Sequence, residues 1–363
     1  MKVVFVCNKY SPAHSYSIES YNFVLKSNGI TSYILNDFFI NGDFSKQLDI
    51  ESISLNDLKN DRDNIVFFFV SPNINNIKTI KKIKRSIKDA KFIYLYHEPI
   101  NATVKRELIK DRGFSIKTIK FIVGLSLFNG KRLIKEFDHV VLPSKNANDI
   151  YEKVRFFRKK SHSIIHLQFL SHSLSSSSNN RYFLSYIGTI AENHGFEEFV
   201  NYLLSSSVPG DLKVLIATSS VLDEDVVKKL INKFGERITI QHGSFMSDET
   251  ISEYYQKTKI LWLGYKHSAQ SGVLPMSFMY GTPVICSKIS SFNEFAKDGI
   301  NCEYIDIQNH NSINNAIDKI LESFEKYQNG CADTYNVFFN PINNTEKIMR
   351  VFLDLSKNDE KQL

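Results

Sequence analysis

The chain has 363 residues, of which 42% are hydrophobic and 23% are charged, and its formal net charge at pH 7 is +6. This length exceeds what one typical hydrophobic core holds, so it predicts two domains, and the composition excludes a disordered chain. The charge excess is small for binding to a phosphate backbone, and no nucleic-acid-binding module is recognisable. We therefore expect no nucleic acid partner.

The cysteines and the N-terminus predict the cellular compartment. The four cysteines have no metal-ligand spacing, and Cys7 and Cys286 lie in apolar runs, which indicates reduced core residues of a cytosolic protein. Residues 1–6 continue directly into a predicted strand, unlike a secretory signal. No segment has the roughly 20 apolar residues of a membrane span. We expect a cytoplasmic protein, either soluble or at the inner face of the membrane.

The first half of the chain alternates short apolar runs with longer amphipathic segments. Residues 17–27 and 73–89 have the pattern of helices. The apolar runs, each expected to be a buried strand, are residues 3–7, 32–35, 65–70, 92–96 and 139–142. This alternation favours a parallel sheet with helices on both faces.

Residues 105–135, within this half, interleave lysine and arginine with large apolar side chains. Such a composition is typical of a surface that rests on anionic lipid, and we expect peripheral membrane contact there. The alternative is a solvated helix, which we expect for the basic segment at residues 78–91.

A polar, serine-rich tract at residues 171–180 interrupts the alternation and is typical of a linker. The alternation then resumes. Strands are expected at residues 183–187, 212–216, 238–241, 259–263 and 282–286, and helices at residues 195–205, 223–234, 247–257 and 274–280. We predict an α/β fold with two Rossmann-like domains, residues 1–172 and 182–336, joined by residues 173–181 and facing a cleft that holds the ligands.

The segment from Ser268 to Ser287 has the pattern of a phosphate-binding loop. A turn of small residues at Ser271 and Gly272 opens into a short apolar helix that ends at Gly281. Such a turn presents free backbone N–H groups and the positive end of the helix dipole, which bind phosphate. The alternative is an ordinary loop, helix and strand without a ligand.

With its neighbours, this segment resembles the nucleotide-sugar-binding domain of GT-B fold glycosyltransferases, in particular family 4 (glycosyl transferases group 1). Four groups of segments match that domain in the family's order. They are residues 186–190 with 194–195, residues 241–243 with 254–255 and 261–264, residues 271–275 with 280–285, and residues 290–294 with 298–299.

The resemblance implies an enzyme that moves a sugar from a nucleotide-diphosphate donor to a saccharide or lipid-linked saccharide acceptor in bacterial surface glycan synthesis. A UDP-sugar is the favoured donor, the reaction is expected to retain the sugar's configuration, and neither a metal nor another cofactor is implied. Residues 337–363 are expected to form a C-terminal helix that packs back on the first domain.

The donor-binding residues that the resemblance implies follow predicted strands or begin predicted helices. They are Gly188, Thr189, His194, Gly195, Gly243, Phe245, Tyr265, Lys266, Ser271, Gly272, Val273 and Glu294. The backbone N–H groups of residues 271–273 are expected to bind the phosphates, with help from Lys266 and His194. Phe245 and Tyr265 are expected to flank the base, with packing between loops as the alternative.

In the first domain the resemblance implies a catalytic pair at the end of a predicted strand. His97 is expected to position the donor sugar, and Glu98 to transfer a proton or orient the acceptor. The alternative is that both side chains are bonded to nearby backbone groups. Tyr10, His14 and Ser144 also follow predicted strands, and they are expected to contact the acceptor.

The chain departs from the family in its charged residues. Ser268 and Met276 stand where the family has paired glutamates, and Thr189 and His194 stand where it has an arginine and a lysine that neutralise the diphosphate. Lys266 is expected to replace part of that charge. The departures leave two alternatives open, a non-catalytic GT-B partner or scaffold protein and a nucleotide-sugar epimerase.

Two acidic triplets, residues 61–63 and 223–225, resemble the metal-binding motif of the other main glycosyltransferase fold. Asp61 lies in a polar turn, and Asp223 lies where a helix is expected to begin. Carboxylates at such places are ordinary caps, so we expect no metal site.

Overall fold

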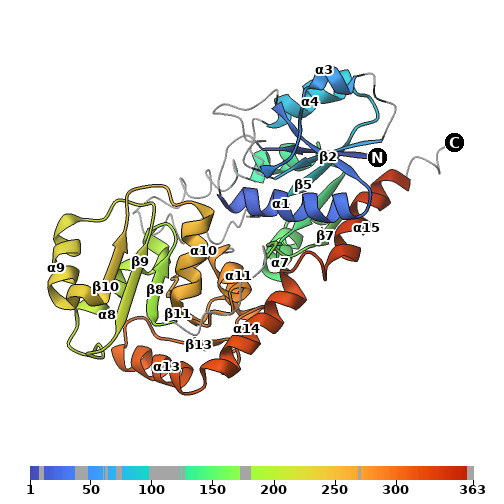
Figure 1. The fold of residues 1–363 in the computed structure, drawn as a ribbon. Coiled ribbons are helices and arrows are strands. Elements are labelled where there is room, and N and C mark those ends of the chain that lie inside the picture. Colours follow the sequence, from blue (N-terminus) through green and yellow to red (C-terminus); the bar gives the residue numbers. More distant parts are fainter. Residues whose placement is uncertain are drawn as a thin grey trace. The chain divides into compact units, whose positions relative to one another are not determined.

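The computed structural model describes residues 1–7, 12–36, 48–59, 61, 64–70, 76–97, 124, 127–171, 181–268 and 271–357. The chain divides into two compact units, which are drawn in Figure 1 and described separately below. The first unit comprises Met1–Leu170 and Asn340–Leu363, and the second comprises Ser171–Phe339. From the sequence, the linker was expected at residues 173–181, of which only residue 181 is described.

The first unit contains a seven-stranded sheet in the order β3-β2-β1-β4-β5-β6-β7, and every strand pair in it is parallel. Its strands are β1 (Lys2–Val6), β2 (Thr31–Leu35), β3 (Ser52–Ile53), β4 (Ile65–Phe69), β5 (Lys91–Leu95), β6 (His139–Leu142) and β7 (His162–Ile164). The predictions for β1, β2, β4, β5 and β6 are confirmed. The two edge strands, β3 and β7, were not predicted, because runs of two or three residues are too short to show a period.

Helices cover both faces of this sheet. They are α1 (Pro12–Ser27), α3 (Leu55–Leu58), α4 (Asn76–Ser86), α7 (Lys145–Glu152) and α15 (Thr345–Lys357). Alternate residues of β1 point to opposite faces, as the pleat requires. Phe5 packs with Ile18 of α1 and Phe352 of α15, whereas Val4 packs in a separate core with α3, α4 and α7. The last helix of the chain is therefore part of the core of the first unit.

The second unit contains a six-stranded sheet, all of whose strand pairs are parallel, in the order β10-β9-β8-β11-β12-β13. Its strands are β8 (Phe183–Ile187), β9 (Lys213–Ala217), β10 (Ile238–Gln241), β11 (Thr258–Leu263), β12 (Val284–Cys286) and β13 (Cys302–Tyr304). The chain runs outward from β8 to β10, crosses to β11 and runs outward in the other direction. In such sheets, ligands bind at the carboxyl ends of the strands where the direction reverses, here β8 and β11.

Helices also cover both faces of the second sheet. They are α8 (Phe196–Leu204), α9 (Glu224–Phe234), α10 (Asp248–Lys257), α11 (Val273–Met279), α12 (Ser290–Asn293), α13 (His310–Glu322) and α14 (Phe324–Phe338). Helices α8, α9 and α13 share one buried core with β8 and β11, and α10 and α11 lie on the other side of the sheet (Figure 1). The predicted α/β fold with two Rossmann-like units is confirmed.

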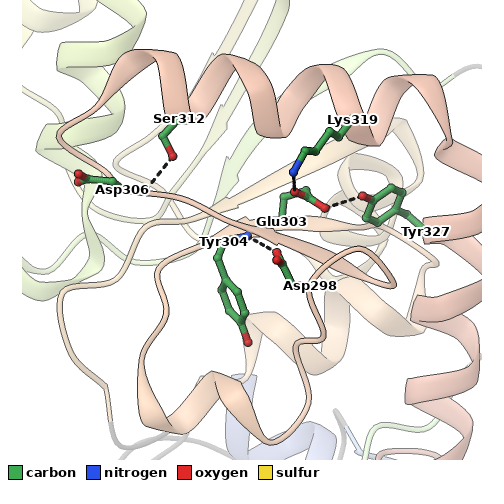
Figure 2. A network of polar contacts seen from close by, with 7 residues as sticks. All are labelled: Asp298, Glu303, Tyr304, Asp306, Ser312, Lys319 and Tyr327. Carbon is green, nitrogen blue, oxygen red and sulfur yellow. Dashed lines mark hydrogen bonds and ion pairs between the residues drawn. The ribbon is translucent and has the colours of Figure 1, made fainter.

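A buried carboxylate on the edge strand β13 forms polar contacts with two helices (Figure 2). Glu303 is 4% exposed, and its Oε2 lies 2.9 Å from Nζ of Lys319 in α13. The hydroxyl of Tyr327 in α14 donates a hydrogen bond of 2.6 Å to Oε1. Both oxygens of this carboxylate thus have partners, as a buried charge requires.

We predict that Tyr327→Phe lowers the free energy of unfolding by about 2 kcal/mol, because it leaves one buried carboxylate oxygen without its donor. Lys319→Met is the matched change on the other oxygen. Lys319→Met should lower the free energy of unfolding by less than Tyr327→Phe does, because the Lys319 side chain is 62% exposed and water can take its place. Urea unfolding of both variants measures the difference, and equal losses would contradict this account.

Candidate functional site

The carboxyl ends of β8 and β11 bring predicted donor-binding residues together. Gly188, directly after β8, has φ +133°, and a β-carbon built on it would lie 3.3 Å from Cγ2 of Val273. Val273 is the first residue of α11. The end of β8 thus packs against the start of the helix that follows the predicted phosphate loop.

Two glycines allow a close contact between the loops that follow β8 and β11. Gly195 has φ +69°, and a β-carbon on it would lie 1.9 Å from the carbonyl oxygen of Gly264, far inside contact distance. Nε1 of Trp262 donates a hydrogen bond of 3.1 Å to the Gly195 carbonyl. Because φ is positive and the space is filled by backbone, position 195 requires glycine.

Hydrogen bonds join the same two loops beside this contact. The backbone N–H of Lys266 donates to the carbonyl of Asn193 at 2.9 Å. The side-chain amide of Asn193 donates to the carbonyl of His267 at 2.8 Å. The segment that leads into α8 and the segment after β11 are therefore held together by backbone and side-chain bonds.

His194 lies flat on Tyr265, with ring centroids 4.4 Å apart and an angle of 10° between the ring planes. Its Nδ1 is 2.8 Å from the carbonyl oxygen of Thr189. A carbonyl only accepts, so we assign the hydrogen to Nδ1, which leaves Nε2 to meet a ligand. Three predicted donor-binding residues thus form one cluster.

Tyr265 is buried, and its ring also contacts Phe292 at a centroid distance of 5.4 Å. Burial raises the pKa of its phenol, which also shares a hydrogen bond with Ser271. Tyr265 thus packs between neighbouring loops, and its expected place beside the base remains a prediction. Phe245, which was expected to flank the base from the other side, is 66% exposed.

The start of α11 differs from the expected phosphate loop in one respect. The Oγ of Ser271 accepts a hydrogen bond of 3.2 Å from the backbone N–H of Val273. This N–H was expected to bind phosphate, but in the structure it already has a partner. Gly272 is the N-cap of α11, and Met276 is buried inside the helix.

Lys266 is not a free cation. Its Nζ lies 2.7 Å from Oε1 of Glu198 in α8. The hydrogen bond with Glu198 raises the pKa of the Lys266 ammonium. The ammonium that was expected to replace part of the missing charge thus already has a carboxylate partner, and its role toward the diphosphate remains a prediction.

Ser220 joins the loops after β8, β9 and β10. Its Oγ accepts a hydrogen bond of 3.0 Å from the N–H of Ile190, and its carbonyl accepts one of 3.0 Å from the N–H of Gly243. Gly243 has φ +73° and lies beside the exposed side chain of Val221. Sequence reasoning missed Ser220 and Glu198. Ser220 could have been found from its place just after a predicted strand. No feature of the sequence around Glu198 indicated a role for that residue.

The remaining predicted donor-binding residue, Glu294, lies at the C-terminal end of α12 and is half-buried. Asp223, the first residue of one acidic triplet, caps α9 by accepting from the N–H groups of Asp225 and Val226. This confirms that the triplet begins at a helix cap. Among the described residues, no group of three His, Cys, Asp or Glu side chains is placed to hold a metal.

In the first unit, His97 follows β5 and is half-buried. Ser144 is buried and caps α7, with its Oγ accepting from the N–H of Ala147 at 3.0 Å. Glu98 and Tyr10 lie outside the described residues, as does the side chain of His14. The catalytic and acceptor-binding roles of these residues remain predictions.

Of the basic region at residues 105–135, only residues 124 and 127–135 are described. Within that part, Leu133 and Ile134 are buried in a core of the first unit, whereas Phe128 is exposed beneath Arg132. No helix within the described ranges has the length and apolar character needed to cross a membrane. Contact with a membrane surface remains a prediction.

Residues 172–332 match the model of the family described as glycosyl transferases group 1. No curated protein matches the sequence. Among solved structures, Anabaena HepE with UDP and glucose has a TM-score of 0.67 at 12% identity, covering 98% of this chain and 100% of that one.

Two further structures are similar in the same way. Sucrose-phosphate synthase from Thermosynechococcus elongatus has a TM-score of 0.69 at 12% identity, with 98% of this chain and 99% of that one covered. The lipopolysaccharide outer core galactosyltransferase WaaB has a TM-score of 0.58 at 12% identity, with 95% and 99% covered. These likenesses establish the fold of the GT-B glycosyltransferases, and together with the family match they support a glycosyltransferase.

We predict that Gly195→Ala destabilises the second unit by about 3 kcal/mol or more, because a methyl group at positive φ would displace the Gly264 backbone. Gly210→Ala is the control, since a β-carbon on Gly210 meets no atom within 4 Å. Thermal unfolding followed by circular dichroism measures both. If Gly195→Ala is as stable as Gly210→Ala, the two loops separate easily and the account is wrong.

Proposed function

We propose that the chain is a glycosyltransferase of the family 4 type, which transfers a sugar from a UDP-sugar to a saccharide or lipid-linked saccharide acceptor in bacterial surface glycan synthesis. The observation that carries this proposal is the group 1 family match over residues 172–332, which include the loops gathered at the carboxyl ends of β8 and β11. The similar HepE structures contain UDP or UDP-glucose, and WaaB is a galactosyltransferase of the lipopolysaccharide outer core. These relatives favour the donor and the class of acceptor.

In the proposed reaction, the bond between the anomeric carbon and the diphosphate oxygen breaks, and its electron pair leaves with UDP. The acceptor hydroxyl oxygen bonds to the anomeric carbon, and its proton passes to the leaving phosphate. This route retains the sugar's configuration and uses no metal or other cofactor. We place the reaction in the cytoplasm, at the inner face of the membrane, with residues 105–135 in contact with the lipid.

The described residues of the second unit would serve this reaction mainly through hydrogen bonds. Nε2 of His194 carries no hydrogen in the assigned tautomer and would accept a hydrogen bond from a sugar hydroxyl. The backbone N–H groups at Ser271 and Gly272 would receive the diphosphate. Fixed donors of this kind stabilise a leaving anion because they need no reorganisation during the reaction. His97 in the first unit would position the donor sugar.

A second candidate function is a non-catalytic GT-B partner protein. It is favoured by Met276, which is buried at the position where the resemblance implies a ribose-binding glutamate, and by the pairing of Lys266 with Glu198. Methionine is at best a weak hydrogen-bond acceptor for a ribose hydroxyl. Such a protein would bind a nucleotide without turning it over, or bind none.

The first test is a thermal-shift series with UDP, GDP, ADP and CMP. A ligand that binds only the folded state adds about 2.7 kcal/mol of stability at a concentration of 100 times its Kd. We expect a selective rise in melting temperature with UDP. If none of the four nucleotides raises the melting temperature, the proposed donor site is contradicted. In a separate activity assay, turnover of the donor without any acceptor would favour an epimerase.

We also predict that His97→Ala lowers the rate of sugar transfer at least about tenfold, since the imidazole positions the reacting sugar. The melting temperature and UDP affinity should stay near their wild-type values, because the second unit is unchanged. His310→Ala, a change in α13, is the control for loss of an imidazole elsewhere. Wild-type turnover in His97→Ala would remove His97 from the reaction.

A further inference from the structure

Glu198 is a charged residue in a buried position. It lies in the first turn of α8 and is 7% exposed. Phe199 and Leu203 of the same helix belong to the core of the second unit. Burying a carboxylate costs free energy unless a cation or strong hydrogen-bond donors compensate it, so Glu198 requires a charged partner.

Lys266 supplies that partner from the loop after β11. Its Nζ lies 2.7 Å from Oε1 of Glu198, and its side chain is 39% exposed. The ammonium therefore touches the buried carboxylate on one side and solvent on the other. Oε2 of Glu198 is buried and has no hydrogen-bond partner among the residues that the structure describes. One lysine thus carries most of the compensation for this carboxylate.

The pair lies at the edge of the sheet where the proposed function places the donor diphosphate. The backbone of Lys266 is bonded to Asn193, the neighbour of His194. Glu198 is on the first turn of the helix that begins after Gly195. An anion bound between these loops would therefore interact with both charges of the pair, not with a free ammonium.

We propose that Glu198 determines how strongly this site discriminates among nucleotides by their phosphate charge. By neutralising Lys266, the carboxylate reduces the gain in affinity that each added phosphate charge brings. The site then recognises a diphosphate mainly through neutral N–H donors, which limits the affinity for the released product. This inference rests on the proposed function, because it assumes that a nucleotide binds at β8 and β11.

The test is a charge series of uridine, UMP and UDP, measured by isothermal titration calorimetry at low salt. Glu198→Gln keeps the shape of the side chain and removes its charge. Coulomb interaction across a partly exposed site predicts UDP binding about tenfold tighter, UMP binding about threefold tighter and unchanged uridine binding. The gain should shrink at high salt, because ions screen it.

Glu197→Gln is the matched control, since Glu197 lies in the same turn, carries the same charge and is exposed to solvent. Its effect on UDP should be much smaller. Lys266→Met combined with Glu198→Gln removes both charges and leaves the net charge of the pair at zero, so UDP binding should stay near its wild-type value. Loss of UDP affinity in this double variant would mean direct contact between Lys266 and the phosphates, and the double variant keeps the inference testable if Glu198→Gln alone does not fold.

Three outcomes would overturn the inference. Weaker UDP binding by Glu198→Gln would mean that Glu198 holds Lys266 in place for direct phosphate contact. Equal changes for all three ligands would mean that the residue acts only through the shape of the site, and equal effects of Glu198→Gln and Glu197→Gln would assign no special role to the buried charge. If the wild-type protein binds none of the three ligands, the proposed function falls as well.

Discussion

The close contact between Gly195 and Gly264 is the constraint on which the candidate site of the second unit depends. It brings the loop after β8 within backbone contact of the loop after β11, and no other residue fits at position 195. Because the loops meet there, His194 lies on Tyr265, Asn193 bonds to Lys266 and His267, and Glu198 reaches Lys266. Two residues without side chains thus determine where the surrounding side chains lie.

The long strands and several of the helices could be predicted from sequence, because apolar periodicity reports burial within one element, whereas α13 and α14 were not predicted. The strands β8 and β10, for example, have the expected limits, Phe183–Ile187 and Ile238–Gln241. The edge strand β13 was missed because its three residues show no period and because Glu303, at its centre, is polar. Its burial depends on Lys319 and Tyr327, which come from helices later in the chain.

For the candidate site, motif order predicted which loops would meet, and the structure brings Gly188, His194, Gly195, Tyr265 and Val273 together as expected from such an order. The partners of individual polar groups could not be predicted. The pairing of Lys266 with Glu198 joins a loop to a helix that precedes it by three strands, β9, β10 and β11. The bond from Val273 to Ser271 depends on the exact form of one turn. Such pairings follow from tertiary structure, which residue spacing does not record.

The position of α15 has a consequence for how the protein is made. Its residues Ile348 and Phe352 fill the same core as Phe5 and Ile18, so that core combines the two ends of the chain. During translation, the second unit can emerge complete while the first still lacks one of its helices. A stop codon before residue 345 would therefore remove part of the core of the first unit while leaving the sequence of the second unit intact.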